Sequence, residues 1–361
     1  MEIPLKDYTL DSFTQLLVKT PEAFPNLKAR YFLTSFRDWG DDRPYTLTGM
    51  FRNHNFQLKQ LGQIRELSTS YEIPETKQIV RVKYYAYLNP ETQVLVCFTQ
   101  ATRTQMERTI DSISRFIGVY DLWISPVAFD EIKRTILLEY PYTKIPFFSA
   151  DRQPSSGLSA KIRPEYRRTF QYHGDDGRET LEELRYYYGV LPRSIQFRIP
   201  GVTDFQINHR GAFNYYDGDL NRMLEHAERA VNLVLQVRRI LEQSKLQVLD
   251  IETARKHLKV PYVIPWRIDF KRELSVSDAE VLVEGLQNNG FAVYNSVISQ
   301  GSTFLDGTVY DEQKKSVFTM SSDSRRMVVA PRYRNSFDSF LRFYETIAEN
   351  FDPEAICAAA I

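Results

Sequence analysis

The stretch QIVRVKYYAYLNPETQVLVCFTQATRTQMERTIDSISRFIG, residues 78–118, decides the fold class. Its first part alternates apolar and polar side chains with a period of two, which is typical of a strand. Asn89 and Pro90 then supply a turn, and QVLVCFT is apolar at successive positions, as in a strand covered on both faces. Apolar side chains follow at helical spacing, at Met106, Ile110, Ile113 and Ile117. The stretch therefore predicts a β-hairpin backed by a helix.

The same order of elements recurs twice along the chain. Residues 315–351 predict two strands joined by a Ser/Asp turn and then a helix with an aromatic face. Residues 194–243 predict a hairpin turning at Pro200-Gly201, a further strand and the longest helix, from about residue 219 to 243. Antiparallel hairpins that are each backed by a helix define an α+β fold.

Changes in pattern along the chain predict three domains. Residues 149–168 are rich in Pro, Ser and Gly and end in a basic run, which indicates a long loop. A second boundary falls near residues 244–262, where the long helix gives way to VPYVIPW. We therefore expect an N-terminal α+β domain at 1–148, a segment with a basic loop, hairpin and long helix at 149–250, and a C-terminal α+β domain at 251–361.

Repeated hairpin-plus-helix units about a common sheet resemble, loosely, the saddle-shaped domain of the TATA-binding proteins. That domain has relatives in the N-terminal parts of some DNA glycosylases. The resemblance lies in the element order of the three repeated stretches and includes no shared motif. It implies a saddle-like sheet, and as a fold-level analogy it says little about function.

The composition excludes several classes of protein. The 361 residues contain 46 Lys and Arg against 46 Asp and Glu, so no whole-chain charge attracts nucleic acid or acidic membranes. With only Cys97 and Cys357, a disulfide framework and a cysteine zinc site are excluded. We expect a soluble, cytoplasmic protein without a membrane partner, because neither a signal peptide nor a membrane-spanning apolar run is present. No phosphate-binding loop or dinucleotide motif occurs, so we expect no cofactor.

Two Glu-x-Lys triplets raise the question of a nuclease site. ETKQIVRV begins at residue 75 and EQKKSVFT at residue 312, and each triplet stands just before an apolar run. In a nuclease the Glu and Lys lie on a strand. Here Pro74 directly precedes Glu75, and the second triplet lies among polar residues between two strand patterns. Both triplets therefore predict exposed hairpin turns.

Two surfaces have the composition of a nucleic-acid interface. The first is the polar face of the hairpins, made by Arg81, Lys83, Tyr85 and Tyr87 on one strand, by Ser194, Gln196 and Arg198 on another, and by Gln206 and Asn208 beside it. The second is the basic loop, with Lys161, Arg163, Arg167 and Arg168. Such side chains hold phosphates by charge and stack or hydrogen-bond bases. A sheet with one face in water shows the same alternation without any ligand.

Asp175 and Asp176 follow the basic loop on a turn between glycines. Asp176 suits the start of the next helix, and the pair is also the best catalytic candidate in the chain. We therefore expect a nucleic-acid-binding protein with DNA or RNA as its partner. The alternatives are an enzyme acting on DNA, either a base-removing glycosylase or a nuclease using Asp175 or Asp176, and a scaffolding subunit that binds proteins and no nucleic acid.

Overall fold

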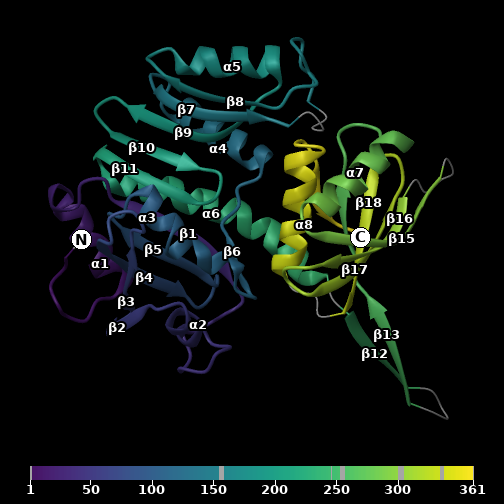
Figure 1. Ribbon diagram of the computed structural model, residues 1–361, viewed down its shortest axis with the longest axis horizontal. Helices are drawn as coiled ribbons and strands as arrows, with labels where there is room; N and C mark the ends of the chain where they lie inside the picture. Colours follow the sequence, from purple (N-terminus) through teal and green to yellow (C-terminus); the bar gives the residue numbers. More distant parts are fainter. Residues whose placement is uncertain are drawn as a thin grey trace.

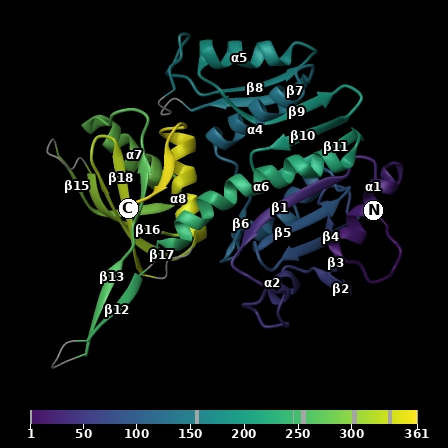
Figure 2. The same cartoon turned by 180° about the vertical axis from the view of Figure 1, so that it is seen from behind.

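Two large antiparallel sheets organise the chain, in a computed structural model that describes residues 2–153, 158–244, 246–252, 257–299, 305–333 and 337–360 (Figure 1). Helices pack on both sheets, so the expected α+β class is confirmed. Figure 2 shows helix α6 (Leu220–Gln243) running from the first sheet to the second. Within these residues, no helix combines the length and the apolar character needed to cross a bilayer.

The first sheet contains eleven strands and includes residues from both sides of position 148. Ten of them pair in the order β2 (Gln57–Leu61), β3 (Ile64–Glu72), β4 (Ile79–Asn89), β5 (Val94–Thr99), β1 (Lys28–Thr34), β11 (Ala212–Gly218), β10 (Thr203–Asn208), β9 (Leu191–Ile199), β7 (Lys144–Arg152) and β8 (Arg168–His173). The short strand β6 (Val119–Asp121) pairs with the end of β1. The boundary expected at residue 148 falls inside β7, so the first two predicted domains share one sheet.

Helices cover the two faces of this sheet unequally. One face packs against α1 (Leu10–Lys19), α4 (Pro126–Glu139), α5 (Gly177–Tyr188) and α6. The other face is covered over β1–β5 by α2 (Leu47–Asn53), α3 (Arg103–Glu107) and the 3₁₀ helix η2 (Ile110–Arg115). A further 3₁₀ helix, η1 (Pro21–Ala23), follows α1 in the chain. That second core does not extend over β7–β11. The second face of these five strands is therefore left without a helical layer among the described residues.

The helix expected from the stripe of Met106, Ile110, Ile113 and Ile117 is broken into α3 and η2. Thr109 lies at the break, where its hydroxyl donates to the carbonyl of Gln105 at 2.6 Å and also bonds the buried hydroxyl of Tyr84. Ile117, expected on the buried stripe, is 59% exposed. Tertiary contacts at Thr109 therefore override the helical spacing of the apolar residues.

The second sheet belongs to the C-terminal part of the chain. Its six strands pair in the order β15 (Phe291–Ile298), β16 (Leu305–Asp311), β17 (Ser316–Ser322), β18 (Arg326–Tyr333), β14 (Trp266–Asp269) and β19 (Ile356–Ala359). Helices α7 (Val276–Asn288) and α8 (Phe337–Asn350) pack on it, and β12 (Leu246–Glu252) pairs with β13 (His257–Val263) as a separate hairpin. Ser275 caps α7 by accepting from the amide of Asp278 at 3.2 Å.

Helix α6 joins the two sheets. Asp219 caps its first turn by accepting from the amide of Asn221 at 2.9 Å, and the observed bounds agree with the helix expected at 219–243. Its apolar stripe, including Met223, Ala227 and Val234, is buried. Because one helix packs on both sheets, the two sheets share a continuous apolar core.

Both Glu-x-Lys triplets lie in hairpin turns, as expected. In the β3–β4 turn the amide of Lys77 donates to the carbonyl of Ile73 at 2.8 Å, and in the β16–β17 turn Lys315 donates to Asp311 at 2.8 Å. Both lysines have left-handed backbones, with φ of 59° and 56°. Lys77 and Lys315 therefore occupy equivalent positions in the two turns. Lys314, the lysine of the second triplet, does not.

Lys314 is a buried anchor between the two sheets, which corrects the expectation of an exposed turn. Its side chain is 1% exposed and lies 3.2 Å from the Asp338 carboxylate. The ammonium donates to the carbonyls of Ser114, Phe116 and Val119 at 3.2, 2.9 and 3.1 Å. A charged side chain is tolerated here because an opposite charge and three carbonyls replace its water.

The two members of this triplet should respond differently to substitution. Lys314→Ala should lower the free energy of unfolding by about 3–5 kcal/mol, because it removes the ammonium that faces the buried Asp338 carboxylate. Glu312→Gln should stay within about 0.5 kcal/mol, because that side chain is exposed. Urea denaturation of both variants tests this contrast, and equal losses would contradict it.

Candidate functional site: a groove and an interdomain cleft

Strand β4 does not present the expected polar surface. Tyr85 is 1% exposed and packs on Phe13 of α1, with ring centroids 5.8 Å apart. Tyr87 is partly buried against the same core, and Lys83 lies 3.8 Å from Glu66. Tyr85 is therefore not accessible to a nucleic-acid base, because α1 covers this face. Arg81 of this strand is exposed, and the Lys83 side chain is 41% exposed.

The basic loop lies far from β4, beside strand β8 and the end of α5. Lys161 places its ammonium 3.5 Å from the ring centroid of Tyr186, and Arg168 stacks on Tyr188 at 4.8 Å. Arg163 and Arg167 are exposed, while residues 154–157 of the expected loop lie outside the described residues. Strands β4 and β8 are seven steps apart in the sheet, which is roughly 30–35 Å. The basic loop and Arg81 therefore belong to separate surfaces.

Asp175 and Asp176 lie on an exposed turn before α5. Asp175 is 3.7 Å from the ammonium of Lys144. The hydroxyl of Tyr172 donates to Asp176 and lowers the pKa of that carboxyl. Asp176 directly precedes α5, as expected, although its side chain makes no capping hydrogen bond to the helix. Neither aspartate lines one of the cavities described below, so the turn offers no enclosed setting for catalysis.

The polar face expected on β9 and β10 is confirmed and extends over neighbouring strands. Gln206 pairs across from Gln196, and Asn208 across from Ser194. Gln206 donates to the Ser194 hydroxyl at 2.6 Å, and Asn214 on β11 donates to Gln206 at 3.1 Å. This sheet-face groove has a volume of about 440 Å³ and is lined by polar side chains that include Lys28, Ser149, Gln171, Ser194, Gln206, Asn208, His209, Arg210 and Asn214.

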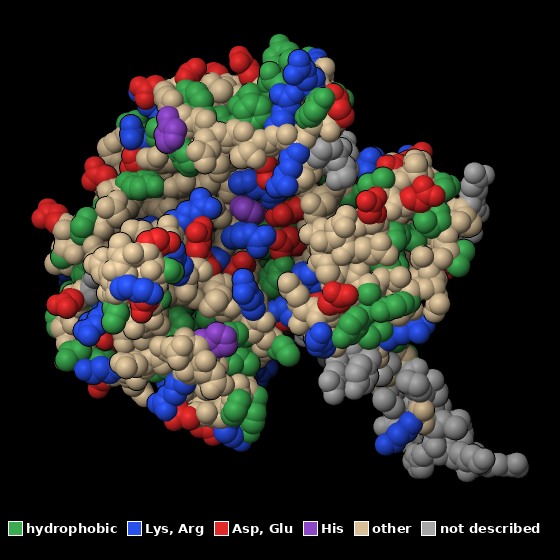
Figure 3. Space-filling model, in the orientation of Figure 1, with side chains coloured by type: hydrophobic (Ala, Val, Ile, Leu, Met, Phe, Trp, Pro, Cys, Tyr) green, Lys and Arg blue, Asp and Glu red, His purple; other side chains and the backbone are tan. Residues whose placement is uncertain are grey.

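A larger cavity, the interdomain cleft, adjoins the groove. Its volume is about 850 Å³, and it lies between α8 on one side and β6 with the β10–β11 turn on the other. In Figure 3 basic, acidic and histidine side chains gather in the hollow between the two halves of the molecule. Arg210 lines both cavities, so the groove and the cleft meet at this residue.

The β10–β11 turn carries His209 and Arg210 to this junction. Asn208 accepts from the amide of Arg210 at 2.9 Å, which tightens the turn. Gly211 follows with a φ of 75°, and a Cβ there would lie 2.5 Å from that of Leu122. Glycine is thus required for the turn to fit against the chain beyond β6.

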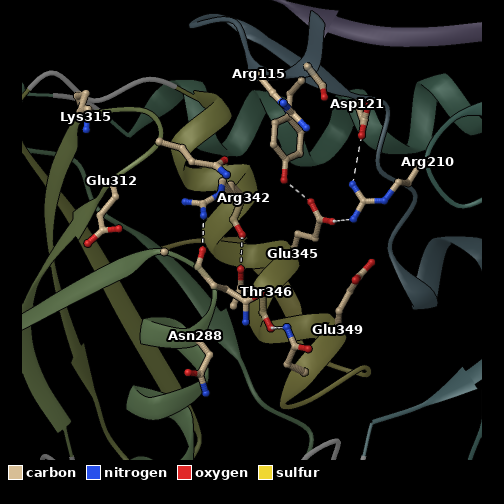
Figure 4. Close-up of a pocket in the computed structure, with 16 residues that line it drawn as sticks. Arg115, Asp121, Arg210, Asn288, Glu312, Lys315, Arg342, Glu345, Thr346 and Glu349 are labelled. Atoms are coloured by element: carbon tan, nitrogen blue, oxygen red, sulfur yellow. Dashed lines mark hydrogen bonds and ion pairs between the residues drawn. The ribbon is translucent and has the colours of Figure 1, made fainter. Parts of the chain in front are cut away.

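Arg210 connects the two halves of the molecule by ion pairs (Figure 4). One of its nitrogens donates to Glu345 of α8 at 2.8 Å, and the other donates to Asp121 of β6 at 3.2 Å. Tyr120 donates its hydroxyl to the second oxygen of Glu345. Buried Arg30 supports Asp121 from behind at 2.6 Å. Glu345 is therefore held by two donors from the first sheet.

Glu349 lies one helical turn beyond Glu345 and is held through a single oxygen. Its Oε1 accepts from the indole of Trp123 and from Arg193, both at 2.8 Å. The Nε2 atom of His209 lies 3.7 Å from the same oxygen. No described residue donates to Oε2 of Glu349, which leaves this oxygen for the cleft.

Burial shifts the pKa values of the groups at the junction. Burial raises the pKa of Glu345 to about 7, and the charge of Glu349 acts in the same direction, whereas Arg210 opposes the shift. The pKa of His209 is well below its usual value because of burial and the nearby Arg193 and Arg210. His209 is therefore neutral, and its Nδ1–H donates to the carbonyl of Arg193 at 3.0 Å. Groups with shifted pKa values in a cleft mark a candidate functional site.

Sequence reasoning missed this cleft because its residues come from distant elements. One local signal is present: Glu345 and Glu349 stand one turn apart on a helix whose other positions are mostly apolar or aromatic. A second is the His-Arg-Gly sequence in a hairpin turn. Neither signal shows that the turn and the helix meet. Among the residues that the structure describes, no group of three His, Cys, Asp or Glu could hold a metal ion.

The fold and site define an α+β protein with a polar sheet groove leading into a charged cleft. Residues 127–210 match the model of the AF_0896_M family middle domain, a segment that ends at Arg210 and includes Arg193 and His209. The chain is also 25% identical over 359 residues to an uncharacterized protein of Archaeoglobus fulgidus, covering 94% of this chain and 92% of that protein. No solved structure matches.

The raised pKa of Glu345 predicts a pH-dependent stability. Glu345 is protonated in the folded protein and ionised in the unfolded chain between its ordinary value near 4.5 and about 7. Folding therefore takes up a proton in this window, so the free energy of unfolding falls as the pH rises from about 4.5 to about 7. The groups facing Glu345 are Tyr120, Asp121, Arg210 and Glu349.

We expect the free energy of unfolding of the wild type, measured against Glu345→Gln, to fall by on the order of 2 kcal/mol between about pH 5 and 8. The glutamine stays neutral throughout, so the comparison isolates this carboxyl. Thermal melts of both proteins across that range provide the measurement. Parallel curves would show that Glu345 titrates normally.

Proposed function

We propose that this protein binds nucleic acid along the sheet-face groove. The observation that carries the proposal is the uncovered face of β7–β11, where alternate side chains are amides, hydroxyls and arginine. Amide side chains read base edges by paired donors and acceptors, and a protein's cations neutralise backbone phosphates. A scaffolding subunit that binds no nucleic acid does not require such a polar face.

Two features of the groove support a ligand rather than a merely solvated sheet. Tyr216 is 41% exposed on the next outward position of β11, and Phe147 is half-buried on β7. Such rings suit stacking of unpaired bases.

The charges along the groove are suited to a phosphate backbone. Lys28 lines the groove, and its ammonium donates to the Asn26 carbonyl at 3.3 Å rather than to a carboxylate. Burial lowers the pKa of Lys28. A nearby phosphate would favour the charged ammonium and so raise this pKa again. Arg30, Arg103 and Arg210 add three further cations to the lining, against the two carboxylates of Glu107 and Asp111. Single-stranded DNA or RNA fits best, because its base edges and faces are both accessible.

Lys28→Gln should weaken binding to every sequence and flatten the dependence of log affinity on log salt by roughly 0.7, the value for one lost contact to a single strand. Lys83→Gln is the matched control, because Lys83 lies on the opposite, helix-covered face. Fluorescence anisotropy with labelled mixed-sequence DNA and RNA, single- and double-stranded, measures both. If the wild type binds none of them at low salt, the scaffolding alternative takes the place of this proposal.

Tyr216→Ala should cost roughly 1–3 kcal/mol of binding free energy if a base stacks on the ring, with little change in the salt dependence. Tyr216→Phe should retain most of the affinity, because it keeps the ring and loses only the hydroxyl that donates to Gln206 at 2.5 Å. Tyr142→Ala, at a fully solvated ring outside the groove, is the control. Equal losses in the Ala and Phe variants would show that the hydroxyl matters and the ring does not.

A further inference from the structure

We propose that a single strand bound in the sheet-face groove passes over the edge strand β8 and is held on its far side by a basic patch at the end of α5. The basic patch consists of Lys161, Arg163, Arg167 and Arg168 with the exposed rings of Tyr166, Tyr186 and Tyr187. The ligand class, a single-stranded nucleic acid, follows from the proposed function, on which this inference rests.

A buried arginine fixes residues 158–168, which carry the four cations of the patch. The guanidinium of Arg152, a residue that is 3% exposed, donates to the carbonyls of Leu158 and Pro164 at 3.1 and 3.2 Å. It also donates to the carbonyls of Tyr188 and Gly189 at the end of α5, both at 3.3 Å. This segment is therefore ordered before any ligand arrives, so little conformational freedom is lost on binding.

Backbone hydrogen bonds hold the same segment on α5. The amides of Lys161 and Ile162 both donate to the carbonyl of Tyr187, at 2.9 and 3.1 Å. The side chains of Lys161 and Arg168 lie over tyrosine rings of α5. These rings carry no net charge, so both cations keep their full attraction for an anion.

The basic patch has an excess of positive charge. Its four cations form no ion pair with a carboxylate in the part of the chain that the structure describes. Residues 158–168 contain one acid, Glu165, and the last two turns of α5 add Glu182 and Glu183. Glu182 is already paired with Lys133 of α4 at 2.6 Å. Two carboxylates therefore stand against the four cations and the buried Arg152.

The patch begins where the outer edge of the groove ends. Ser149 and Gln171 line the groove and pair with each other across β7 and β8. Three residues further along this strand pair, roughly 10 Å away, Arg152 pairs with Arg168. Because β8 is the last strand in the pairing order, none of the described strands separates the groove from the patch. In Figure 3 basic and hydrophobic side chains gather at the upper right, where Figure 1 shows the end of α5.

The chemistry of the patch favours a nucleic acid over an acidic protein. Arg163 and Arg167 are exposed, and the planar fork of a guanidinium bonds two phosphate oxygens at once. Tyr166, Tyr186 and Tyr187 are 57%, 58% and 44% exposed, so their rings are available to stack on unpaired bases. An acidic peptide would use the charges and leave the rings without a matching partner.

Strand length separates the patch from the groove. The probes are labelled mixed-sequence single strands of about 6 and about 20 nucleotides, chosen around the site sizes of about 4–16 nucleotides that one OB fold covers. Arg163→Asn combined with Arg167→Gln removes two exposed cations, and asparagine suits the left-handed backbone of Arg163, whose φ is 46°. The matched control, Lys19→Gln combined with Lys59→Gln, removes the same charge from α1 and the opposite edge strand β2.

The ratio of long-strand to short-strand affinity should fall at least about tenfold in the patch variant, because a second contact on the same strand acts through its effective concentration. The control variant should keep the wild-type ratio. For the long strand alone, the dependence of log affinity on log salt should flatten by roughly 1.4 in the patch variant, about 0.7 for each lost contact. Fluorescence anisotropy across a salt series measures both quantities.

The outcomes separate this inference from the proposed function. An unchanged ratio in the patch variant would overturn the patch and leave the groove in place. If the patch variant loses long-strand affinity while Lys28→Gln and Tyr216→Ala bind both strands like the wild type, the groove proposal falls and the patch remains a nucleic-acid contact. If the wild type binds neither strand at low salt, both fall.

A labelled polyglutamate peptide tests whether charge alone explains the patch. The wild type should bind this peptide much more weakly than the long strand, because the peptide offers no bases to the tyrosine rings. Peptide binding as tight as that of the long strand, and lost in the patch variant, would overturn the assignment to nucleic acid in favour of an acidic protein partner.

Discussion

The position of Arg210 between Asp121 and Glu345 is the contact on which the cleft depends. Its guanidinium brings a carboxylate of the first sheet and one of α8 to the same group, so the two halves of the molecule are held at a fixed separation there. The buried Asp121 and Glu345 carboxylates are costly to bury unless their partners are well placed. Hydrogen bonds from Arg30 to Asp121 and from Tyr120 to Glu345 hold these two carboxylates in position.

The apolar core and the Lys314 anchor also hold the two sheets in their relative positions. Helix α6 spans both sheets, and Lys314 ties the β16–β17 turn to three carbonyls of the first unit. The cleft is therefore bounded by elements that cannot separate without exposing core and unpairing buried charges. A rigid boundary is what allows Glu345 to remain in a poorly solvated position with an altered pKa.

The two faces of the large sheet differ in what covers them, and this difference creates the groove. Helices pack on one face along its length, but only the β1–β5 half is covered on the other. The uncovered strands carry Gln196, Gln206 and Asn214, which hydrogen-bond to their neighbours across the sheet. This face ends at the β10–β11 turn, where Arg210 lines both the groove and the cleft.

Several elements follow from the local sequence alone. The alternation in β9 and β10 predicts their polar face, since successive side chains of a strand point to opposite sides. The apolar stripe predicts α6 close to its observed bounds, because helical spacing is local. The two Glu-x-Lys triplets predict hairpin turns for the same reason. These features depend on residues within one element.

The functional geometry depends on which elements meet, and this was decided by the tertiary structure. Strand β4 has the same alternation as β9, yet α1 buries Tyr85 because it packs on that face. Lys314 and Lys77 look equivalent in sequence, but only Lys314 meets a second domain. His209, Glu345 and Glu349 stand more than 130 positions apart between turn and helix, and no local pattern relates them. The pKa shifts of His209 and Glu345 arise from burial and charge at the contact between the sheets, which exists only in the folded chain.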